Sequence, residues 1–452
     1  MASDTGMTRL LGFIYLNGSV PNVTTVSQNL RLRVTALFSL VSTAIVLIWR
    51  ASPSWNTLRG DESLLLSDAL DRGLSASLQS FGGYMHLVQR LALWFTSLFP
   101  PQLFPHVIFV IAIGFWITNL ALFGFVIQRL TSKTALWLVV PAASTLPPLG
   151  IELMGDLVHI QIAMFIGVAS LVVSGQLPKS PKLLHAFGVY VFLFGLSSPS
   201  IALISAWAFY RHEFPIAGSR EDDKPNRIVL RYSLAALFIQ LWVTTIQDDR
   251  QIAFSFNNFL EGVRFMIHGL LPQPYRDYYF DVNTNQNLVV NSVFLFGVLG
   301  LLILTLIQAT KVVHDDRPAS RVIELVAFGV ASTAFYTTIS DDYHTGYVAA
   351  LYVFAFLGIV VGLLQLKSWR RAGFALLMLT VVIGSFQSFT PNSIDDVYFG
   401  GSGWLYDELA PWDQSLEVAK QACTEIPGRN IFVATNKIDS YWGVVMNCKE
   451  LK

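Results

Sequence analysis

Two adjacent carboxylates, Asp61 and Glu62, stand where a membrane enzyme can hold a catalytic base. They come about ten residues after an apolar run over 34–49, which we interpret as the first membrane-spanning segment. The acids are therefore expected just outside the bilayer, near the start of a long hydrophilic loop over 50–103. A carboxylate in that position can take the proton from a hydroxyl group of a substrate.

The residues that follow in this loop have a helical period with two different faces. The polar face comprises Gln79, Gly83, His86 and Arg90. The apolar face comprises Leu87, Leu91, Trp94 and Leu98. This pattern predicts an amphipathic helix that lies in the membrane interface. Its polar face would bring an imidazole and a guanidinium towards the acids and line a pocket for a phosphate and a sugar.

One base and a few hydrogen-bond donors are enough to transfer a sugar from a phosphate. The phosphate leaves readily when donors meet its charge, so the reaction needs a carboxylate for the acceptor's proton but little acid help. A hydrolase with two opposed carboxylates is the alternative. Adjacent residues, however, rarely flank one bond from both sides.

The acidic residues also bear on metal binding. The histidines are scattered and no His-Glu-x-x-His motif occurs, so no zinc site is expected. We expect no cofactor. A divalent magnesium or manganese ion at Asp248-Asp249 or at Asp341-Asp342 is the alternative, because such ions prefer oxygen ligands.

Composition indicates the class of protein. Of the 452 residues, 53% are hydrophobic and only 13% are charged, which is too apolar for a soluble protein and typical of a polytopic membrane protein. The formal net charge is zero, and no nucleic-acid partner is expected. The two cysteines exclude a thiolate metal cluster and leave room for one disulfide.

We therefore expect an all-α polytopic membrane domain over 34–389. About eleven transmembrane segments are predicted, several of them shorter than a perpendicular span requires. The apolar runs lie at 34–49, 104–128, 134–147, 157–174, 183–196, 199–210, 229–247, 287–309, 321–339, 346–366 and 372–388.

Basic residues between the apolar runs predict which loops face the cytoplasm. Lysine and arginine are concentrated at 129–133, 179–182, 211–231, 311–321 and 367–371. By the positive-inside rule these loops and the N-terminal segment 1–33 are cytoplasmic. The assignment requires that 183–210 be two short helices that turn around Pro199, which interrupts helical hydrogen bonds. One long tilted helix is the alternative and would place the most basic loop outside.

The extracytoplasmic face then receives most of the residues that can do chemistry. Besides the first-loop acids and the loop over 248–286, these are Glu152, Asp156, Arg250, Asp341, Asp342, Tyr343 and His344. Glu152 and Asp156 bracket a very short turn between two apolar segments, and acids at that depth are costly unless they are paired or functional. His159 and Gln161 follow in the next helix. We interpret this histidine as a packed polar residue rather than as a ligand.

The segment 390–452 differs from the rest and is expected to be a small extracytoplasmic α+β unit. A helix is predicted over 413–426 and a short strand over 430–435. In an oxidising compartment Cys423 and Cys448 would pair and close a loop of about 25 residues. In a cytoplasmic tail they would stay reduced. The aromatic residues of this unit suit a sugar surface and the membrane interface equally well.

The order of these motifs resembles the GT-C superfamily of integral membrane glycosyltransferases. The motifs are the first-loop acids, Gly83-Tyr84-x-His86-x-x-x-Arg90, the turn from Glu152 to Gln161, Ser198-Pro199-Ser200 and the late Asp342-Tyr343 turn. More narrowly, the chain resembles uncharacterised bacterial multi-pass members from about residue 33 to the C-terminus. It departs from them at Gln89, where proline is frequent, and at Asp342, where an arginine often precedes the tyrosine.

The resemblance implies an inverting glycosyltransferase in the bacterial plasma membrane, with its C-terminus outside. The donor would be a polyprenyl-phosphate-linked sugar and the acceptor a cell-envelope glycan or glycolipid. Asp61 matches the family's base, with Glu62 as its substitute. Substrate binding would fall to Tyr84, His86, Arg90, Glu152, Asp156, Arg250, Asp341, Asp342, Tyr343 and His344.

Two other functions stay open for a multi-pass protein of this composition. One is a flippase or transporter of a lipid-linked precursor, which broken helices favour. The other is an O-antigen-type polymerase, whose large late periplasmic loop would normally be basic, whereas the charges over 248–286 are mixed.

Overall fold

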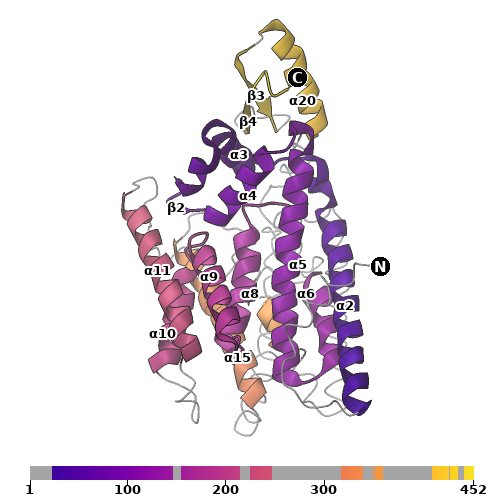
Figure 1. Cartoon of the computed structure of the whole chain (residues 1–452), viewed down its shortest axis with the longest axis vertical. Coiled ribbons are helices and arrows are strands. Elements are labelled where there is room, and N and C mark those ends of the chain that lie inside the picture. Colours follow the sequence, from indigo (N-terminus) through magenta and orange to yellow (C-terminus); the bar gives the residue numbers. More distant parts are fainter. Residues whose placement is uncertain are drawn as a thin grey trace, which may run out of the picture.

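The computed structural model describes residues 23–145, 154–213, 224–246, 317–339, 350–351, 353–358, 360, 410–426, 428–435 and 442–451. Within these ranges the chain is mainly helical and contains little sheet. The helices stand side by side in an elongated bundle, and a small C-terminal unit rises from one end of it (Figure 1). This architecture agrees with the helical class that the composition predicts.

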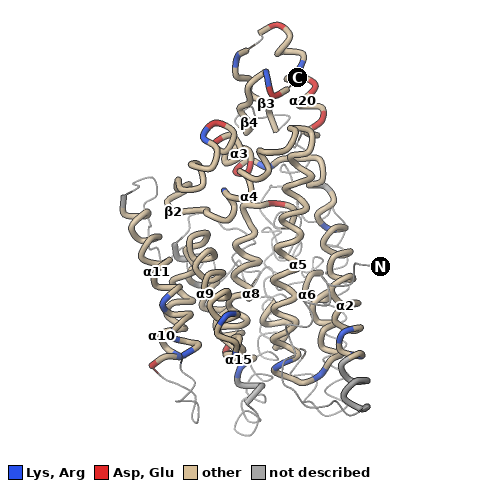
Figure 2. Tube along the Cα trace, viewed as in Figure 1, with Lys and Arg blue, Asp and Glu red and all other residues tan. Residues whose placement is uncertain are grey.

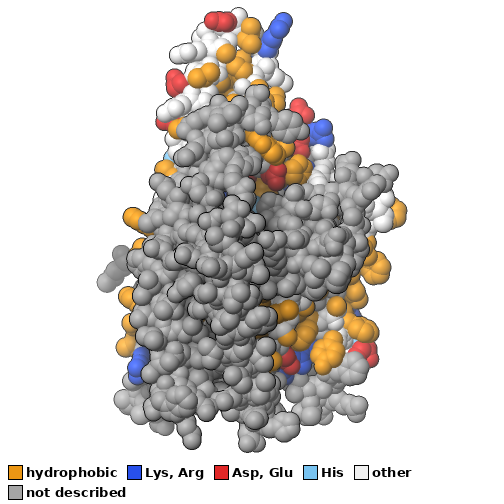
Figure 3. All heavy atoms as spheres, turned by 180° about the vertical axis from the view of Figure 1, so that it is seen from behind, with side chains coloured by type: hydrophobic (Ala, Val, Ile, Leu, Met, Phe, Trp, Pro, Cys, Tyr) orange, Lys and Arg blue, Asp and Glu red, His pale blue; other side chains and the backbone are white. Residues whose placement is uncertain are grey.

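Three of the described helices are long and apolar enough to cross a membrane. They are α2 (Val23–Ala51), α5 (Phe104–Thr131) and α11 (Lys224–Ile246). One side of α2 exposes large hydrophobic side chains at helical spacing: Leu30, Val34, Phe38, Ile45 and Trp49. Seen from behind, hydrophobic side chains also lie along the flanks of the bundle (Figure 3). Exposed apolar faces of this extent suit contact with lipid.

Further helices belong to the described part of the bundle. They are η4 (Thr134–Leu138), α6 (Val139–Ala143), α8 (Ile160–Ser174), α9 (Pro181–Gly195), α10 (Ile201–Glu213) and α15 (Arg317–Ile339). The interruption predicted around Pro199 is confirmed, because α9 ends at Gly195 and α10 begins at Ile201. The alternative of one long tilted helix is therefore wrong. The apolar runs predicted at 287–309 and 372–388 lie outside the described residues.

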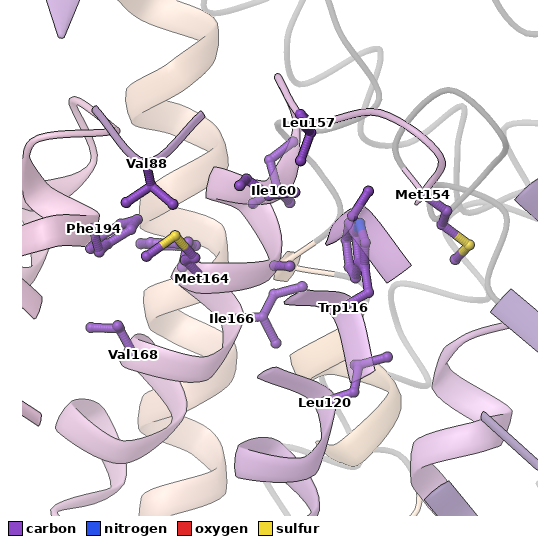
Figure 4. Packing of buried hydrophobic residues seen from close by; sticks show 14 of the residues in the cluster. Val88, Trp116, Leu120, Met154, Leu157, Ile160, Met164, Ile166, Val168 and Phe194 are labelled. Atoms are coloured by element: carbon purple, nitrogen blue, oxygen red, sulfur yellow. The ribbon is translucent and has the colours of Figure 1, made fainter. Parts of the chain in front are cut away.

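The hydrophobic core continues from the bundle into the segment that precedes α8. Trp116 and Leu120 of α5 lie near Ile166 of α8, and Leu157 and Ile160 belong to the same cluster (Figure 4). All five side chains are buried. The position of the segment before α8 is therefore set by packing against the helices and not by its own hydrogen bonds alone.

A polar pair is buried where α5 and α8 approach each other closely. A Cβ atom on Gly167 would collide with the side chain of Asn119, so the glycine makes this approach possible. The Asn119 amide is satisfied at both ends, because Nδ2 donates to Phe115 O at 2.8 Å and Oδ1 accepts from the Tyr190 hydroxyl at 2.8 Å. Small residues and satisfied polar pairs of this kind stabilise helix contacts in a membrane.

The first loop folds into a compact cap over one end of the bundle. Its elements are η1 (Ser52–Asn56), α3 (Gly60–Arg72), η2 (Gly73–Leu78), β1 (Ser80–Phe81), β2 (Tyr84–Met85), α4 (Leu87–Ser97) and η3 (Pro101–Leu103). The two strands form an antiparallel hairpin in which Ser80 pairs with Met85. Gly82 and Gly83 make its turn with φ of 58° and 87°, a conformation that favours glycine at both positions.

The amphipathic helix predicted from Gln79 onwards begins only at Leu87, so its predicted start is wrong. The hairpin occupies the place of the first turns, and α11 holds it there. Gln240 accepts from Met85 N–H at 3.1 Å and donates to Met85 O at 3.3 Å. A helix 155 residues away thus overrides the local helical period.

The polar face of α4 points inward rather than towards water. Gln89 and Arg90 are buried, and α4 packs against α3 and η2 on that side. Leu98, on the apolar face, is exposed, which agrees with the predicted contact of this face with the interface. The turn between α9 and α10 supports the start of α4, because Val88 N–H donates to Ser197 Oγ at 3.0 Å.

The C-terminal unit contains α20 (Trp412–Glu425), β3 (Asn430–Ala434) and β4 (Gly443–Asn447). The predicted helix and first strand are confirmed, and β4 is an element that the sequence did not predict. The two strands are antiparallel, with Asn430 opposite Asn447. Cys423 and Cys448 form the predicted disulfide, with 5.4 Å between their Cα atoms.

Charged residues are distributed unequally between the two ends of the molecule. Lysine and arginine gather at the ends of α2, α5, α10 and α15 that lie far from the C-terminal unit (Figure 2). Acidic residues are concentrated in the first loop and in the C-terminal unit (Figure 2). The bundle between them is almost free of charge, as expected for a body that spans a membrane.

Candidate functional site

The two first-loop acids have opposite environments. Both lie in the first turn of α3, and adjacent residues of a helix project about 100° apart, so the two acids point in different directions. Glu62 faces inward, with 1% of its surface exposed. Asp61 lies on the exposed side. Glu62, which the sequence offered as the substitute base, is therefore the acid that the fold buries.

The carboxylate of Glu62 is held by backbone donors on both sides. Oε1 accepts from Leu157 N–H at 2.5 Å, and Oε2 accepts from Arg59 N–H at 3.4 Å. The first of these bonds joins α3 to the segment before α8, across 95 residues of sequence. Glu62 is therefore an anchor between two loops as well as a titratable group.

Asp156 lies in that same segment and is 3% exposed. Its Oδ1 accepts from Val158 N–H at 2.5 Å, and its Oδ2 lies 2.8 Å from His159 Nδ1. Arg59 Nη1 stands 3.8 Å from the same Oδ2 and completes an ion pair. Asp156 thus has an imidazole, a guanidinium and a backbone amide around it.

Gly155 lets this segment approach η1. A Cβ atom on Gly155 would come within 2.5 Å of the Ser54 side chain, so any larger residue would push the segment away. Ser54 also receives a hydrogen bond from Arg59 Nη2 at 3.1 Å. The close backbone approach therefore brings Asp156 and Arg59 together.

Burial and charge shift the pKa values of the two acids in opposite directions. Desolvation raises the pKa of Glu62 well above 4.5, and the charge of Asp156 and a hydrogen bond between the two carboxyls raise it further. Desolvation also works to raise the pKa of Asp156, but His159, Arg59 and Val158 N–H outweigh it, and the pKa is lowered. The carboxyl of Glu62 therefore keeps its proton more readily than that of Asp156.

A second group of polar side chains lies beside the acid pair. Gln161 Nε2 donates to the Tyr84 hydroxyl at 3.3 Å, and Gln161 is only two residues beyond His159. The rings of Tyr84 and His86 are 4.1 Å apart at their centres. Tyr84, His86, His159 and Gln161 are thus grouped around the start of α8.

Arg90 is engaged within the first loop. Nη1 donates to Asp68 Oδ2 and to Ala76 O, both at 3.1 Å, and Nη2 donates to Ser80 O at 3.1 Å. Burial lowers its pKa, although Asp68 opposes that shift. These contacts fasten η2 and β1 to α3. Contact of Arg90 with a donor phosphate stays a prediction.

The structure brings together some of the predicted site residues and leaves others aside. Glu62 bonds the segment of Asp156 through Leu157 N–H, Tyr84 bonds Gln161 at the start of α8 and lies against His86, and Asp61 lies on the exposed side of α3. The other predicted residues lie outside the described residues: Glu152, Arg250, Asp341, Asp342, Tyr343 and His344. Among the described residues, no group of three or more His, Cys, Asp or Glu side chains is placed to hold a metal ion.

The sequence did not predict Arg59 as part of the site, and it predicted His159 only as a packed polar residue. Arg59 has no periodic signal, because it precedes α3 and acts both through its backbone amide and through its side chain. The signal available for His159 was its spacing of three residues from Asp156, which allows the two side chains to meet in a turn. The spacing is common enough that it indicates little by itself.

Comparison with known proteins adds no family assignment. Neither the family models nor the curated proteins compared with this chain match it. Function is therefore inferred from the geometry of the site together with the order of the motifs.

Proposed function

We propose that this protein is an inverting integral membrane glycosyltransferase of the GT-C type. It moves a sugar from a polyprenyl-phosphate donor to a cell-envelope glycan or glycolipid acceptor. The observation that carries this proposal is the buried pair Glu62 and Asp156, whose pKa values are shifted in opposite directions, at the first loop that joins the candidate spans α2 and α5. A single proton acceptor beside the membrane is the equipment that such a transfer needs.

The reaction is a one-step displacement. The acceptor oxygen forms a bond to the anomeric carbon while the bond from that carbon to the phosphate oxygen breaks. The phosphate leaves with the electron pair, and the acceptor's proton passes to Asp156, the acid of the two that ionises more readily. His159, 2.8 Å from Asp156, and Arg59, 3.8 Å from it, stabilise the charge of this carboxylate before the transfer.

Sugar recognition falls to the polar group beside the acids. Tyr84, His86 and Gln161 offer hydroxyl, imidazole and amide groups, which can donate to or accept from sugar hydroxyls. His159 is the more open member of the ion pair, with 19% of its side chain exposed against 4% for Asp156. Substrate therefore approaches the acids from the His159 side.

The same proposal includes a topology. About eleven transmembrane segments, a cytoplasmic N-terminus and an extracytoplasmic C-terminus in a bacterial plasma membrane agree with the gathering of lysine and arginine at the end far from the C-terminal unit. The disulfide Cys423–Cys448 supports an oxidising compartment for that unit. The acid pair then faces the outside, where envelope acceptors are found.

The test uses the full-length protein in liposomes with a panel of short-chain polyprenyl-phosphate sugars and a crude envelope-glycan acceptor. We expect the parent protein to consume one donor, and Asp156→Asn to lower the rate by roughly 10²- to 10⁴-fold, the usual contribution of a general base. Asp61→Asn makes the same substitution at the exposed acid next to Glu62; it is the control and is expected to stay within about threefold of the parent.

Three outcomes would contradict the proposal. Full activity of Asp156→Asn and of Glu62→Gln would show that the base lies elsewhere. Loss of activity in Asp61→Asn alone would return that role to Asp61. Movement of a donor across the bilayer without its consumption would identify a flippase instead.

A further inference from the structure

The C-terminal unit contacts the first loop through α20. Trp412 is 1% exposed, its Nε1 donates to Pro101 O at 2.8 Å, and its ring stacks on Phe104. The neighbouring Asp413 accepts from Asn56 Nδ2 at 2.7 Å through Oδ1. This contact therefore ties α20 to both η1 and η3, the two ends of the first loop.

A separate contact joins β4 to α3. The ring of Trp442 lies over Gly60, where an added Cβ would come within 2.6 Å of Trp442 Cδ2. Val445 N–H donates to Ser67 Oγ at 3.0 Å. Gly60 is the first residue of α3 and precedes Glu62 by two positions. The unit thus rests on the turn that carries the buried acid.

The disulfide joins the two contacts. Cys423 lies near the end of α20 and Cys448 directly follows β4, and both residues are buried. The bond links α20, which contacts η1 and η3, to β4, which contacts α3. The two contacts therefore keep a fixed spacing. The unit therefore acts on the first loop as one piece.

We propose that the C-terminal unit is a clamp that fixes the position of α3, and with it the contact of Glu62 with the segment before α8. Trp442 and Trp412 are positioning residues, since they act on the site through α3 and η3. The bond from Leu157 N–H to Glu62, at 2.5 Å, is the contact that the clamp protects. A misplacement of about 1 Å can lower an enzyme's rate by about 10²-fold, so a small shift of α3 is enough to matter.

A glycan-binding role is the competing use of this unit. A surface cavity of about 350 Å³ lies beside the α20 contact and is lined by Gln102, Asp413, Gln414, Leu416, Glu417 and Lys420. Its polar side chains could accept a sugar. If the unit only binds glycan, disturbing its contact with α3 will leave the acid pair unchanged.

The test introduces a side chain that separates α3 from the clamp. Gly60→Ala introduces a methyl group against Trp442 without changing charge, and alanine is a better helix former than glycine. Gly114→Ala is the matched control, because that glycine in α5 has open space around its missing Cβ. Backbone amide hydrogen exchange of the full-length protein in detergent, without substrate, is measured in residues 154–159.

We expect Gly60→Ala to speed exchange in residues 154–159 by at least about tenfold, and Gly114→Ala to leave it at the parental rate. In the transferase assay, Gly60→Ala should lower kcat by about 10²-fold at an unchanged KM for the donor. Exchange that rises only within the C-terminal unit, or equally in both variants, would overturn the clamp.

A second pair of variants keeps the proposal testable if Gly60→Ala does not fold. Ser67→Ala removes the acceptor of Val445 N–H, and Ser75→Ala removes an exposed hydroxyl that bonds only within η2's own turn to Arg72 O. Only Ser67→Ala should speed exchange in residues 154–159. The clamp rests on the proposed function for its kinetic readout alone, so faster exchange in a protein without transferase activity would support the clamp and contradict the transferase.

Discussion

Two clusters of partly or fully buried charge lie at opposite ends of this molecule and differ in their balance. At the end near the C-terminal unit, two acids, Glu62 and Asp156, share the single guanidinium of Arg59 and the imidazole of His159. At the other end, Glu324 alone receives two guanidinium groups. Arg321 Nη1 lies 2.8 Å from its Oε2, and Arg211 Nη2 contacts the same oxygen.

The difference in charge balance distinguishes a structural contact from a site that can react. Glu324 has more positive charge around it than it needs, and its contacts join α10 to α15. Near the C-terminal unit, burial and the charge of Asp156 outweigh the attraction of Arg59, and the pKa of Glu62 is raised. Acids whose pKa values are shifted by burial and by each other in this way are frequent in catalytic sites.

The largest expected effect that tests this comparison comes from Arg59→Met. The variant leaves the buried Asp156 with the imidazole of His159 but without its guanidinium partner, and removal of one member of a buried ion pair usually lowers the free energy of unfolding by about 3–5 kcal/mol. The measurement is the unfolding of the purified protein in detergent, followed by intrinsic tryptophan fluorescence. An effect no larger than that of Arg321→Met would contradict the asymmetry.

Asp156→Asn should have the next largest effect, and it should depend on pH. Because the folded-state pKa of Asp156 is lowered, its charge stabilises the fold above its ordinary pKa of 3.8, and this contribution is lost as pH falls through the folded value. The variant should therefore be less stable than the parent by about 1.5–3 kcal/mol near neutral pH, the usual value of charged hydrogen bonds. The gap should close in acid. A gap that is constant with pH would show that the pKa of Asp156 is the same in the folded and the unfolded protein, which would contradict the lowered pKa.

Glu62→Gln should act in the opposite direction. Because the folded-state pKa of Glu62 is raised, the fold is favoured below the ordinary pKa of 4.5, and this advantage is lost as pH rises through the folded value. Glutamine resembles the protonated acid, so the variant should match the parent in acid and become the more stable protein at higher pH. The difference should grow by at most about 1.4 kcal/mol per pH unit. Parallel profiles of unfolding free energy against pH would contradict the raised pKa of Glu62.

The smallest effect is expected at the other end of the molecule. Arg321→Met leaves Glu324 paired with Arg211, and 25% of the Glu324 side chain is exposed, so water can replace the lost contact. The free energy of unfolding should fall by about 0–1 kcal/mol, as for ordinary surface ion pairs. A loss above about 2 kcal/mol would mean that this cluster depends on both arginines and that the two ends are alike.

Local signals in the sequence predicted much of the scaffold. The apolar runs predicted α2, α5 and α11, and Pro199 predicted the break between α9 and α10. Residues 413–435 predicted a helix and a strand, both of which are present. These predictions succeed because hydrophobic period and helix breaking act over a few residues and need no distant partner.

The signals that failed were those that a distant element could override. The helical period from Gln79 competes with the Gly82-Gly83 dipeptide, which is itself a hairpin signal. The contact of Gln240 with Met85, 155 residues away, decides in favour of the hairpin. Sequence patterns do not contain the position of α11, so the competition could not be settled from the loop alone.

The sequence by itself determined that acids would lie just beyond the first span, and only the tertiary structure decided which of them is buried. The orientation of α3 about its axis makes that choice between Asp61 and Glu62. It is set by Leu157, 95 residues away, and by Val445, which bonds Ser67 across 378 residues. A rotation of α3 by about 100° would exchange the two acids, but it would also displace the buried Leu65, Leu66 and Ala69, so the apolar residues of the helix and its contacts with other elements make the choice together.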